Sequence, residues 1–190
     1  VANPTVTVVG DYTVVLTARN GCQSTATVRV SPDQSAPQVD VKGGTISCAV
    51  KQINLDAKEK SNKNVRWNWT GPNGFTSAIA NPQVTLPGSY TLVTTNIDNG
   101  CTVTSNAQVA DDTKGPQVAT NTPRELNCSV TEVNISASVP VSGTYTYQWS
   151  TVGGVISSGQ QSALAKATAA AKYTVVVTDT RNGCSTVADV

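Results

Sequence analysis

Five cysteines offer the most distinctive chemistry in this chain: Cys22, Cys48, Cys101, Cys128 and Cys184. They lie about 26 or 53 residues apart and never form the Cys-x-x-Cys spacing of thiolate zinc sites. The chain contains no histidine, which excludes imidazole acid–base catalysis, a Ser-His-Asp nucleophile and imidazole metal ligands from it. We therefore expect the cysteines to form disulfides in an oxidising compartment.

The nearest pair of carboxylates is Asp111 and Asp112, which could hold calcium at a joint between domains. The equivalent segment earlier in the chain offers only Asp33, and no Asp-x-Asp spacing occurs. We expect these carboxylates to be solvated linker charges, with calcium as the alternative, and we expect no cofactor and no catalytic centre.

An aromatic group at Trp67, Trp69 and Phe75 could present a platform for sugar rings. Trp69 recurs as Trp149, but Phe75 becomes Val155 in the next copy of the pattern. A binding site used by every copy should recur in each, so we expect these aromatic side chains to be core residues. A glycan contact through Trp67 and Phe75 is the alternative.

The net charge of +1 and the 13% of charged residues give neither sign an excess. Nucleic-acid binding needs clustered Lys and Arg, and so does binding to an anionic membrane surface, so neither partner is expected. No run of about 20 apolar residues occurs, so this segment is not expected to insert into a membrane.

Two sequence phrases recur and divide the chain. The phrase Tyr-Thr…Asn-Gly-Cys occurs at 12–22, 90–101 and 173–184. A second phrase, Cys48 with 53–55 and Trp69, returns as Cys128 with 133–135 and Trp149. A recurrence near 80 residues is typical of whole small β domains in tandem. We predict the C-terminal part of one repeat at 1–36, followed by complete repeats at 37–114 and 115–190.

The repeated phrases have the period of strands. Tyr12, Val14 and Leu16 alternate with Thr13, Val15 and Thr17, a period of two that allows one face to be buried. Asn-Gly then indicates a tight turn. This predicts hairpins at 88–97 with 101–109 and at 172–179 with 184–190. The alanine-rich segment 163–172 is also predicted to contain a strand.

About seven short strands per repeat, one Trp in the third and a Tyr opening the sixth resemble the immunoglobulin-like sandwich, including its tyrosine corner. Val14, Leu92 and Val175 stand where antibody domains place a core cysteine. Short proline-closed linkers at 31–37 and 111–116 favour an extended arrangement. The expected fold class is all-β, with tandem immunoglobulin-like β-sandwich domains in an extended rod.

This resemblance implies a disulfide pairing. In such a sandwich the first strand, here expected at about 45–50 with Cys48 near its start, leaves from the pole where the last hairpin turns. This implies Cys48–Cys101 and Cys128–Cys184. Cys22 is then unpaired, because its partner precedes Val1. The competing Cys22–Cys48 pairing would span one domain length, on the order of 35 Å, whereas a disulfide needs Cα atoms within about 7 Å.

The fuller pattern, with Ile46-Ser47-Cys48 and the segment from Trp69 to Phe75, resembles the repeats of very large Bacteroidota surface adhesins. That family includes the gliding-motility adhesin exported by the type IX route. The resemblance implies an extracellular, cell-surface stalk segment that gives reach, stiffness and attachment. Its implied partners are neighbouring repeats and surface polysaccharide or other cell-surface material.

Two alternatives from other classes stay open. One is an accessory carbohydrate-binding or spacer module of a secreted enzyme. The other is a self-assembling extracellular fibre subunit, whose incomplete first domain is completed by a neighbouring chain.

Overall fold

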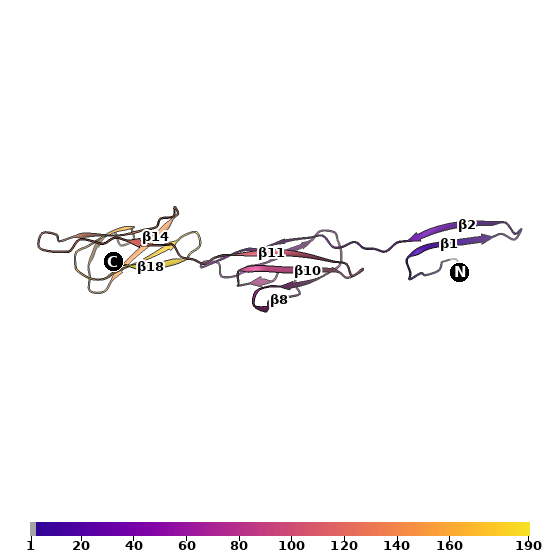
Figure 1. Cartoon of the computed structure of the whole chain (residues 1–190), viewed down its shortest axis with the longest axis horizontal. Coiled ribbons are helices and arrows are strands. Elements are labelled where there is room, and N and C mark those ends of the chain that lie inside the picture. The colour runs from indigo at the N-terminus through magenta and orange to yellow at the C-terminus, as the bar shows by residue number, and fades with distance from the viewer. Residues whose placement is uncertain (1–2) are drawn as a thin grey trace.

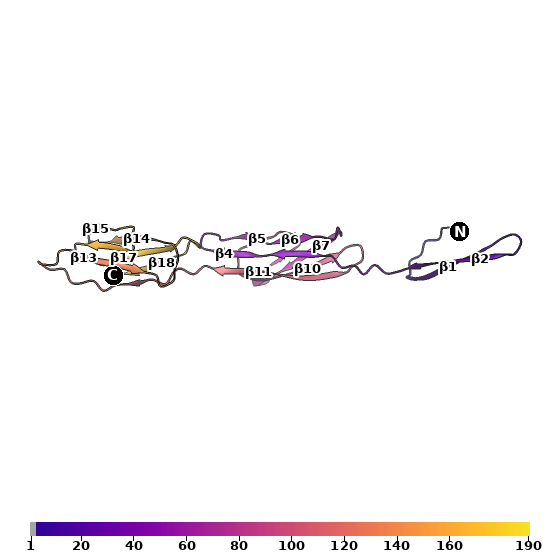
Figure 2. The same cartoon turned by 90° about the horizontal axis from the view of Figure 1, so that it is seen from above.

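The computed structural model describes residues 3–190 as strands in three groups that follow one another along the long axis (Figure 1). The first group, here called the hairpin unit, is the antiparallel pair β1 (Gly10–Thr17) and β2 (Gln23–Val30). The middle sandwich contains β3–β11 and the last sandwich β12–β18. Figure 2 shows the same succession from above. The prediction of an all-β chain is confirmed.

The middle sandwich has a five-stranded sheet on one side and two strand pairs on the other. The sheet has the order β4 (Gly44–Ser47), β11 (Thr102–Asp112), β10 (Gly88–Asn96), β7 (Val65–Thr70), β8 (Thr76–Ser77). Opposite it, β3 (Val39–Lys42) pairs with β6 (Asp56–Glu59), and β5 (Ile53–Asn54) pairs with β9 (Gln83–Val84). Two packed layers of mainly antiparallel strands, with the last hairpin central to one sheet, form an immunoglobulin-like arrangement, as predicted.

The last sandwich repeats this plan with two separate sheets. One is β14 (Tyr145–Thr151), β17 (Tyr173–Asp179), β18 (Ser185–Asp189). The other is β12 (Ala119–Thr120), β13 (Val133–Ser138), β16 (Leu164–Ala167), β15 (Ile156–Ser158). The strand predicted within 163–172 is therefore confirmed as β16. Between residues 3 and 190 no helix is long and apolar enough to cross a membrane.

One tryptophan lies at the centre of each sandwich. Trp69 is opposite Leu92 across β7 and β10, and both side chains are fully buried. Trp149 is opposite Val175 in the same way in the last sandwich. Burying a side chain of this size stabilises the fold by about 2–3 kcal/mol. The aliphatic residue opposite each tryptophan occupies the place of the missing core cysteine.

A tyrosine corner occurs in each of the three groups, as the sequence predicted. The phenol of Tyr90 donates to the carbonyl of Leu86 at 2.8 Å. Tyr12 and Tyr173 make the same bond to the residue four positions upstream, at 2.6 Å each. Burial raises the pKa of Tyr90. These bonds fix the start of the strand that leads into each Asn-Gly-Cys hairpin.

The hairpin unit keeps this local structure without a layer opposite it. The side chains of Val14 and Leu16 are 63% and 70% exposed, whereas Leu92 at the position of Val14 is fully buried. The hairpin is therefore determined by its own register and turn, and burial follows only where further strands of the repeat are present.

The first strand of the middle sandwich is divided between the two layers. It starts at Val39 as β3, pairs with β6, and after Gly43 continues as β4, which pairs in parallel with β11. A Cβ atom at Gly43 would lie 1.9 Å from the Gln108 carbonyl oxygen, so only glycine fits at this crossing. The strand expected at about 45–50 is present only as far as Ser47, so the placement of Cys48 near its start is wrong: Cys48 follows the end of β4.

Candidate functional site at the joint between the sandwiches

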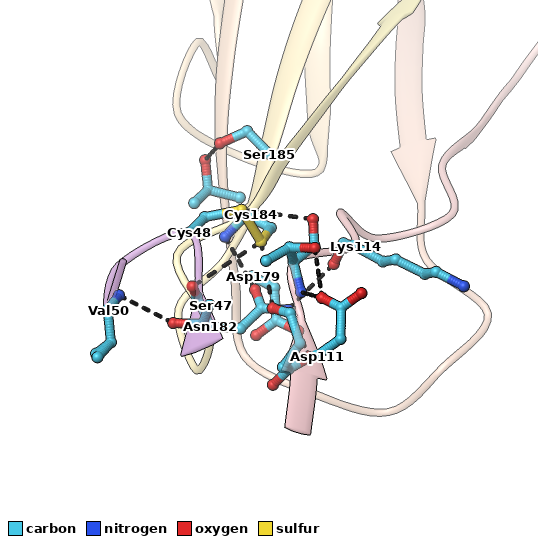
Figure 3. Close-up of a disulfide and its surroundings, with 12 residues drawn as sticks. Ser47, Cys48, Val50, Asp111, Lys114, Asp179, Asn182, Cys184 and Ser185 are labelled. Atoms are coloured by element: carbon cyan, nitrogen blue, oxygen red, sulfur yellow. Dashed lines mark hydrogen bonds between the residues drawn. A yellow bond between two sulfur atoms is a disulfide. The ribbon is translucent and has the colours of Figure 1, made fainter. Parts of the chain in front are cut away.

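A disulfide joins the two sandwiches. Cys48 of the middle sandwich is bonded to Cys184 of the last sandwich, with the Cα atoms 5.0 Å apart (Figure 3). The predicted pairs Cys48–Cys101 and Cys128–Cys184 are both wrong. Cys22, Cys101 and Cys128 are free thiols.

The error has a geometric cause. The parallel register of β4 and β11 places Ser47 opposite Asp112, at the end of β11. Cys101 precedes the start of this strand of 11 residues, so roughly 35 Å of extended backbone separates the two poles. Cys48 therefore lies at the pole where the linker to the last sandwich begins, and it meets the hairpin of the next domain.

The hairpin side of the joint is held in a fixed shape by Asn182. Its Oδ1 accepts the backbone N–H of Cys184 at 2.9 Å, and its side chain is only 2% exposed. Gly183 adopts a φ of +71°, a conformation that glycine allows without strain. The turn between β17 and β18 thus directs the sulfur of Cys184 toward the middle sandwich.

A short turn presents Cys48 on the other side. The N–H of Ser47 donates to the carbonyl of Val50 at 2.9 Å, and the N–H of Val50 donates to Oγ of Ser47 at 3.0 Å. This pair of bonds closes the chain around Cys48 directly after β4 ends. Figure 3 shows the bond from Val50 to Ser47 across the loop that carries Cys48.

Hydrogen bonds across the joint surround the disulfide. The amide nitrogen of Asn182 donates to Oδ1 of Asp112 at 3.0 Å and to the Lys114 carbonyl at 3.1 Å. The backbone N–H of Ala49 donates to the Asn182 carbonyl at 3.0 Å. A Cβ atom at Gly183 would lie 2.8 Å from the Ala49 side chain, so the two turns are in close contact.

The acidic linker residues at this joint are already engaged. Asp112 faces Arg181 at 3.4 Å, and Arg181 also lies 3.5 Å from Asp179. Asp111 accepts the hydroxyl of Thr113 at 2.6 Å, and this bond holds the pKa of Asp111 below its usual value. Within residues 3–190 no group of three or more Cys, Asp or Glu side chains is arranged as a metal site.

The joint between the hairpin unit and the middle sandwich has the same plan without a disulfide. Asn99 and Asn96 both donate to the Ser35 carbonyl, at 3.0 Å and 3.3 Å. The carboxylate of Asp33 accepts hydrogen bonds from Ser35, and these bonds hold the pKa of Asp33 below its usual value. The same carboxylate lies 3.9 Å from the ammonium group of Lys63. Cys101 occupies the place of Cys184 and is a free thiol.

The aromatic residues Trp67, Trp69 and Phe75 pack separately against the core of the middle sandwich. Trp69 is buried, and its indole N–H donates to the Ala80 carbonyl at 3.2 Å. Trp67 and Phe75 are half-buried and pack against the middle core, where Phe75 meets Tyr90 edge-on at 5.3 Å. The three rings therefore do not form one exposed platform.

The signal that sequence reasoning missed is the glycine pair Gly43-Gly44. It divides the first strand, and this division moves Cys48 to the other pole of its domain. The segment 181–184 belongs to a repeated phrase, and Asp112 belongs to the proline-closed linker at 111–116. Their meeting across two domains depends on the division of that strand.

No family model and no curated protein sequence matches this chain. Solved structures with a similar arrangement include the human desmocollin-1 ectodomain, with a TM-score of 0.36 and 11% identity over 91% of this chain. The titin domains Z1Z2 in complex with telethonin have a TM-score of 0.37 and 12% identity over 82% of this chain and 95% of that one. Murine CEACAM1b has a TM-score of 0.33 and 9% identity over 80% of this chain and 98% of that one.

The chain spans 39% of the length of the desmocollin-1 structure that it matches. These likenesses concern chain course alone, since all three TM-scores are below 0.5. The fold assignment therefore depends on the strand order, the paired layers and the tyrosine corners described above.

Proposed function

We propose that this chain is a structural segment of an extracellular, cell-surface repeat protein, an adhesin or surface filament in which it provides reach and stiffness. The observation that carries the proposal is the covalent joint between consecutive sandwiches, Cys48–Cys184. A disulfide is typical of proteins that fold in an oxidising compartment, which supports an extracellular location.

The joint supports stiffness because it provides a second covalent connection. Domains joined by one short linker are expected to move relative to each other unless their interface is large and apolar. Here the backbone runs through Thr113 and Lys114, and the disulfide forms a separate link beside it. Two links restrict both bending and twisting, and the bonds of Asn182 to Asp112 and Lys114 restrict them further.

A structural role also fits the surface of the strands. Exposed positions on the central hairpins carry mainly neutral polar side chains: Thr91 bonds Asn106, and Thr178 bonds Ser185. With a net charge of +1 the segment is neither strongly attracted to nor repelled by charged surfaces. We propose that adhesive contact is made elsewhere in the protein or by many weak surfaces together.

Small-angle X-ray scattering on the whole chain tests the stiffness. We expect the oxidised chain to scatter as an elongated particle. Reduction should broaden its distance distribution while the β signal in circular dichroism is retained. A Cys101→Ser variant is the matched control and should scatter like the parent chain. A compact oxidised particle, or no change on reduction of Cys48–Cys184, would contradict the role.

Within this class we propose a surface array of the Bacteroidota gliding-adhesin type, exported by the type IX route. The support is the phrase that ends in Asn-Gly-Cys, together with the segment from Trp69 to Phe75. Antibodies against the segment should label intact cells of the source organism, and labelling should be lost when that export route is disabled. Labelling that needs permeabilised cells would argue against this placement.

A further inference from the structure

The five cysteines lie in two kinds of turn. In the first kind, the residues on either side of the turn are joined by two hydrogen bonds. Around Cys48, Ser47 and Val50 exchange two hydrogen bonds at 2.9 Å and 3.0 Å. Around Cys128, the N–H of Asn127 donates to the Val130 carbonyl at 2.9 Å, and the N–H of Val130 donates to Oδ1 of Asn127 at 2.9 Å. The turn therefore holds Cys128 in the same way as the earlier turn holds Cys48, and Cys128 is exposed to solvent.

The second type is the Asn-Gly-Cys hairpin. The backbone N–H of Cys184 is bonded to Oδ1 of Asn182 at 2.9 Å. Cys101 has the same bond to Asn99 at 2.9 Å, and Cys22 to Asn20 at 3.1 Å. The glycine in between has a positive φ in all three, +85° at Gly21, +74° at Gly100 and +71° at Gly183. The one disulfide formed within residues 3–190 joins one cysteine of each type.

The position of Cys128 completes the parallel. Hydrogen bonds between Tyr173 and Val190 show that β18 ends beside the start of β17. A groove of about 430 Å³ next to Val190 is lined by Leu126, Ile135 and Tyr173. The cysteine turn that follows Leu126 thus lies at the pole where β18 ends, as the Cys48 turn lies where β11 ends.

We propose that the Cys128 turn is the receiving half of a second joint of the same kind. Its partner is the Asn-Gly-Cys hairpin of another repeat of this type, and the Cys101 and Cys22 hairpins are the complementary halves. The five cysteines thereby form one recurring crosslink between successive repeats, with no crosslink inside any repeat. This inference does not depend on the surface role proposed above and can fail separately.

The chemistry is thiol oxidation by a low-molecular-weight disulfide such as oxidised glutathione. The Cys128 thiolate attacks the reagent, forms a mixed disulfide and releases one glutathione thiolate. The hairpin thiolate of the partner then attacks the Cys128 sulfur and releases the second. One disulfide bond forms and one is broken, two electrons pass to glutathione, and its two thiolates take up the two protons.

The register of the last sandwich permits a direct test. Val190 pairs with Tyr173 as Ala107 pairs with Tyr90, so a second copy of residues 108–190 can follow Val190 in register. In this lengthened chain, oxidised with glutathione, peptide mapping should find Cys128 bonded to Cys184 of the added copy. Cys128 should also become resistant to alkylation.

Changing Cys184→Ser in the added copy alone is the matched control, and it should return Cys128 to full alkylation while Cys48–Cys184 stays intact. The proposal is overturned if Cys128 remains alkylated in the lengthened chain, or if it pairs with a cysteine outside an Asn-Gly-Cys hairpin, while Cys48–Cys184 is present.

A measurement on the chain at its own length covers the case in which the added copy does not fold. One variant, Cys22→Ser with Cys101→Ser, keeps only the Cys128 turn. The other, Cys128→Ser, keeps only the hairpins. Mixed in equal amounts and oxidised, the complementary halves should give more mixed dimer than both homodimers together. A statistical distribution of dimers would overturn the proposal.

Discussion

The two joints of this molecule are built from the same hairpin and differ in what faces it. At the joint of the last sandwich, Asn182 and Cys184 meet Asp112 and Cys48 of the preceding domain. At the joint of the middle sandwich, Asn99 donates to the Ser35 carbonyl, and Cys101 is a free thiol. The strand end that carries a cysteine turn thus converts a hydrogen-bonded contact into a covalent one.

This difference shows that the shape of the hairpin and its crosslink have separate causes. The Asn-Gly-Cys turn has the same internal hydrogen bond in both places, so its shape does not depend on the crosslink. The covalent link between domains depends on the partner turn, which residues 3–36 do not contain. Each of the following predictions changes one element at one joint and its counterpart at the other.

Removing the disulfide should have the largest effect. The crosslink spans a sequence separation of 136, and closing a loop of this length restricts the unfolded chain by on the order of 5 kcal/mol. We expect Cys184→Ser to lower the free energy of unfolding by several kcal/mol, measured by denaturant titration with tryptophan fluorescence. Cys101→Ser should leave the midpoint unchanged, and equal losses in the two variants would contradict this account.

Replacing the asparagine of the hairpin should have the next largest effect. Asn182 is buried and bonds Cys184, Asp112 and Lys114, so Asn182→Ala leaves several polar groups without a partner, at a cost of about 2–3 kcal/mol. Asn99 is less buried, so Asn99→Ala, which loses the bonds to the Ser35 carbonyl and the Cys101 N–H, should cost about 1 kcal/mol. The unfolding midpoints of the two variants measure the difference, and a larger loss at Asn99 would refute the comparison.

Replacing the glycine of each hairpin distinguishes the effect of backbone strain from the effect of contact with the neighbouring turn. Gly183 and Gly100 have φ values of +71° and +74°, so replacement by alanine costs each about 1 kcal/mol. A new Cβ at Gly183 also meets Ala49, whereas at Gly100 nothing lies within 4 Å. We expect Gly183→Ala to lose more stability than Gly100→Ala and to slow formation of Cys48–Cys184 during oxidative refolding. Equal behaviour would mean that the two turns do not touch.

Acid should have the smallest effect, and it should be similar at both joints. Side-chain hydrogen bonds from Thr113 and Ser35 lower the pKa values of Asp111 and Asp33. The resulting stability is present above the usual carboxyl pKa of about 3.9 and is lost as pH falls through the lowered values. Asp111→Asn and Asp33→Asn should each flatten the pH dependence of the unfolding midpoint below about pH 4. A gain in stability on acidification would contradict this assignment.

Much of the fold could be predicted because its signals are local. Alternation at Tyr173, Val175 and Val177 and the turn at Asn182-Gly183 determine a hairpin, and the structure contains it as β17 and β18. The same holds for Trp69 and Trp149 at the two core centres. The disulfide partner could not be read from such signals, because it depends on how the first strand crosses between the layers at Gly43 and on which domain lies beyond.

The disulfide also alters how the chain would carry tension. When the two ends are pulled apart, force that reaches Cys48 passes through the sulfur bridge to Cys184 and leaves the intervening residues slack. The sequence separation of 136 corresponds to about 450–490 Å of extended chain that unfolding cannot release while the bridge holds. Unfolding of either sandwich under load would then add little length. The maximum extension of the segment therefore stays nearly constant until the disulfide is reduced.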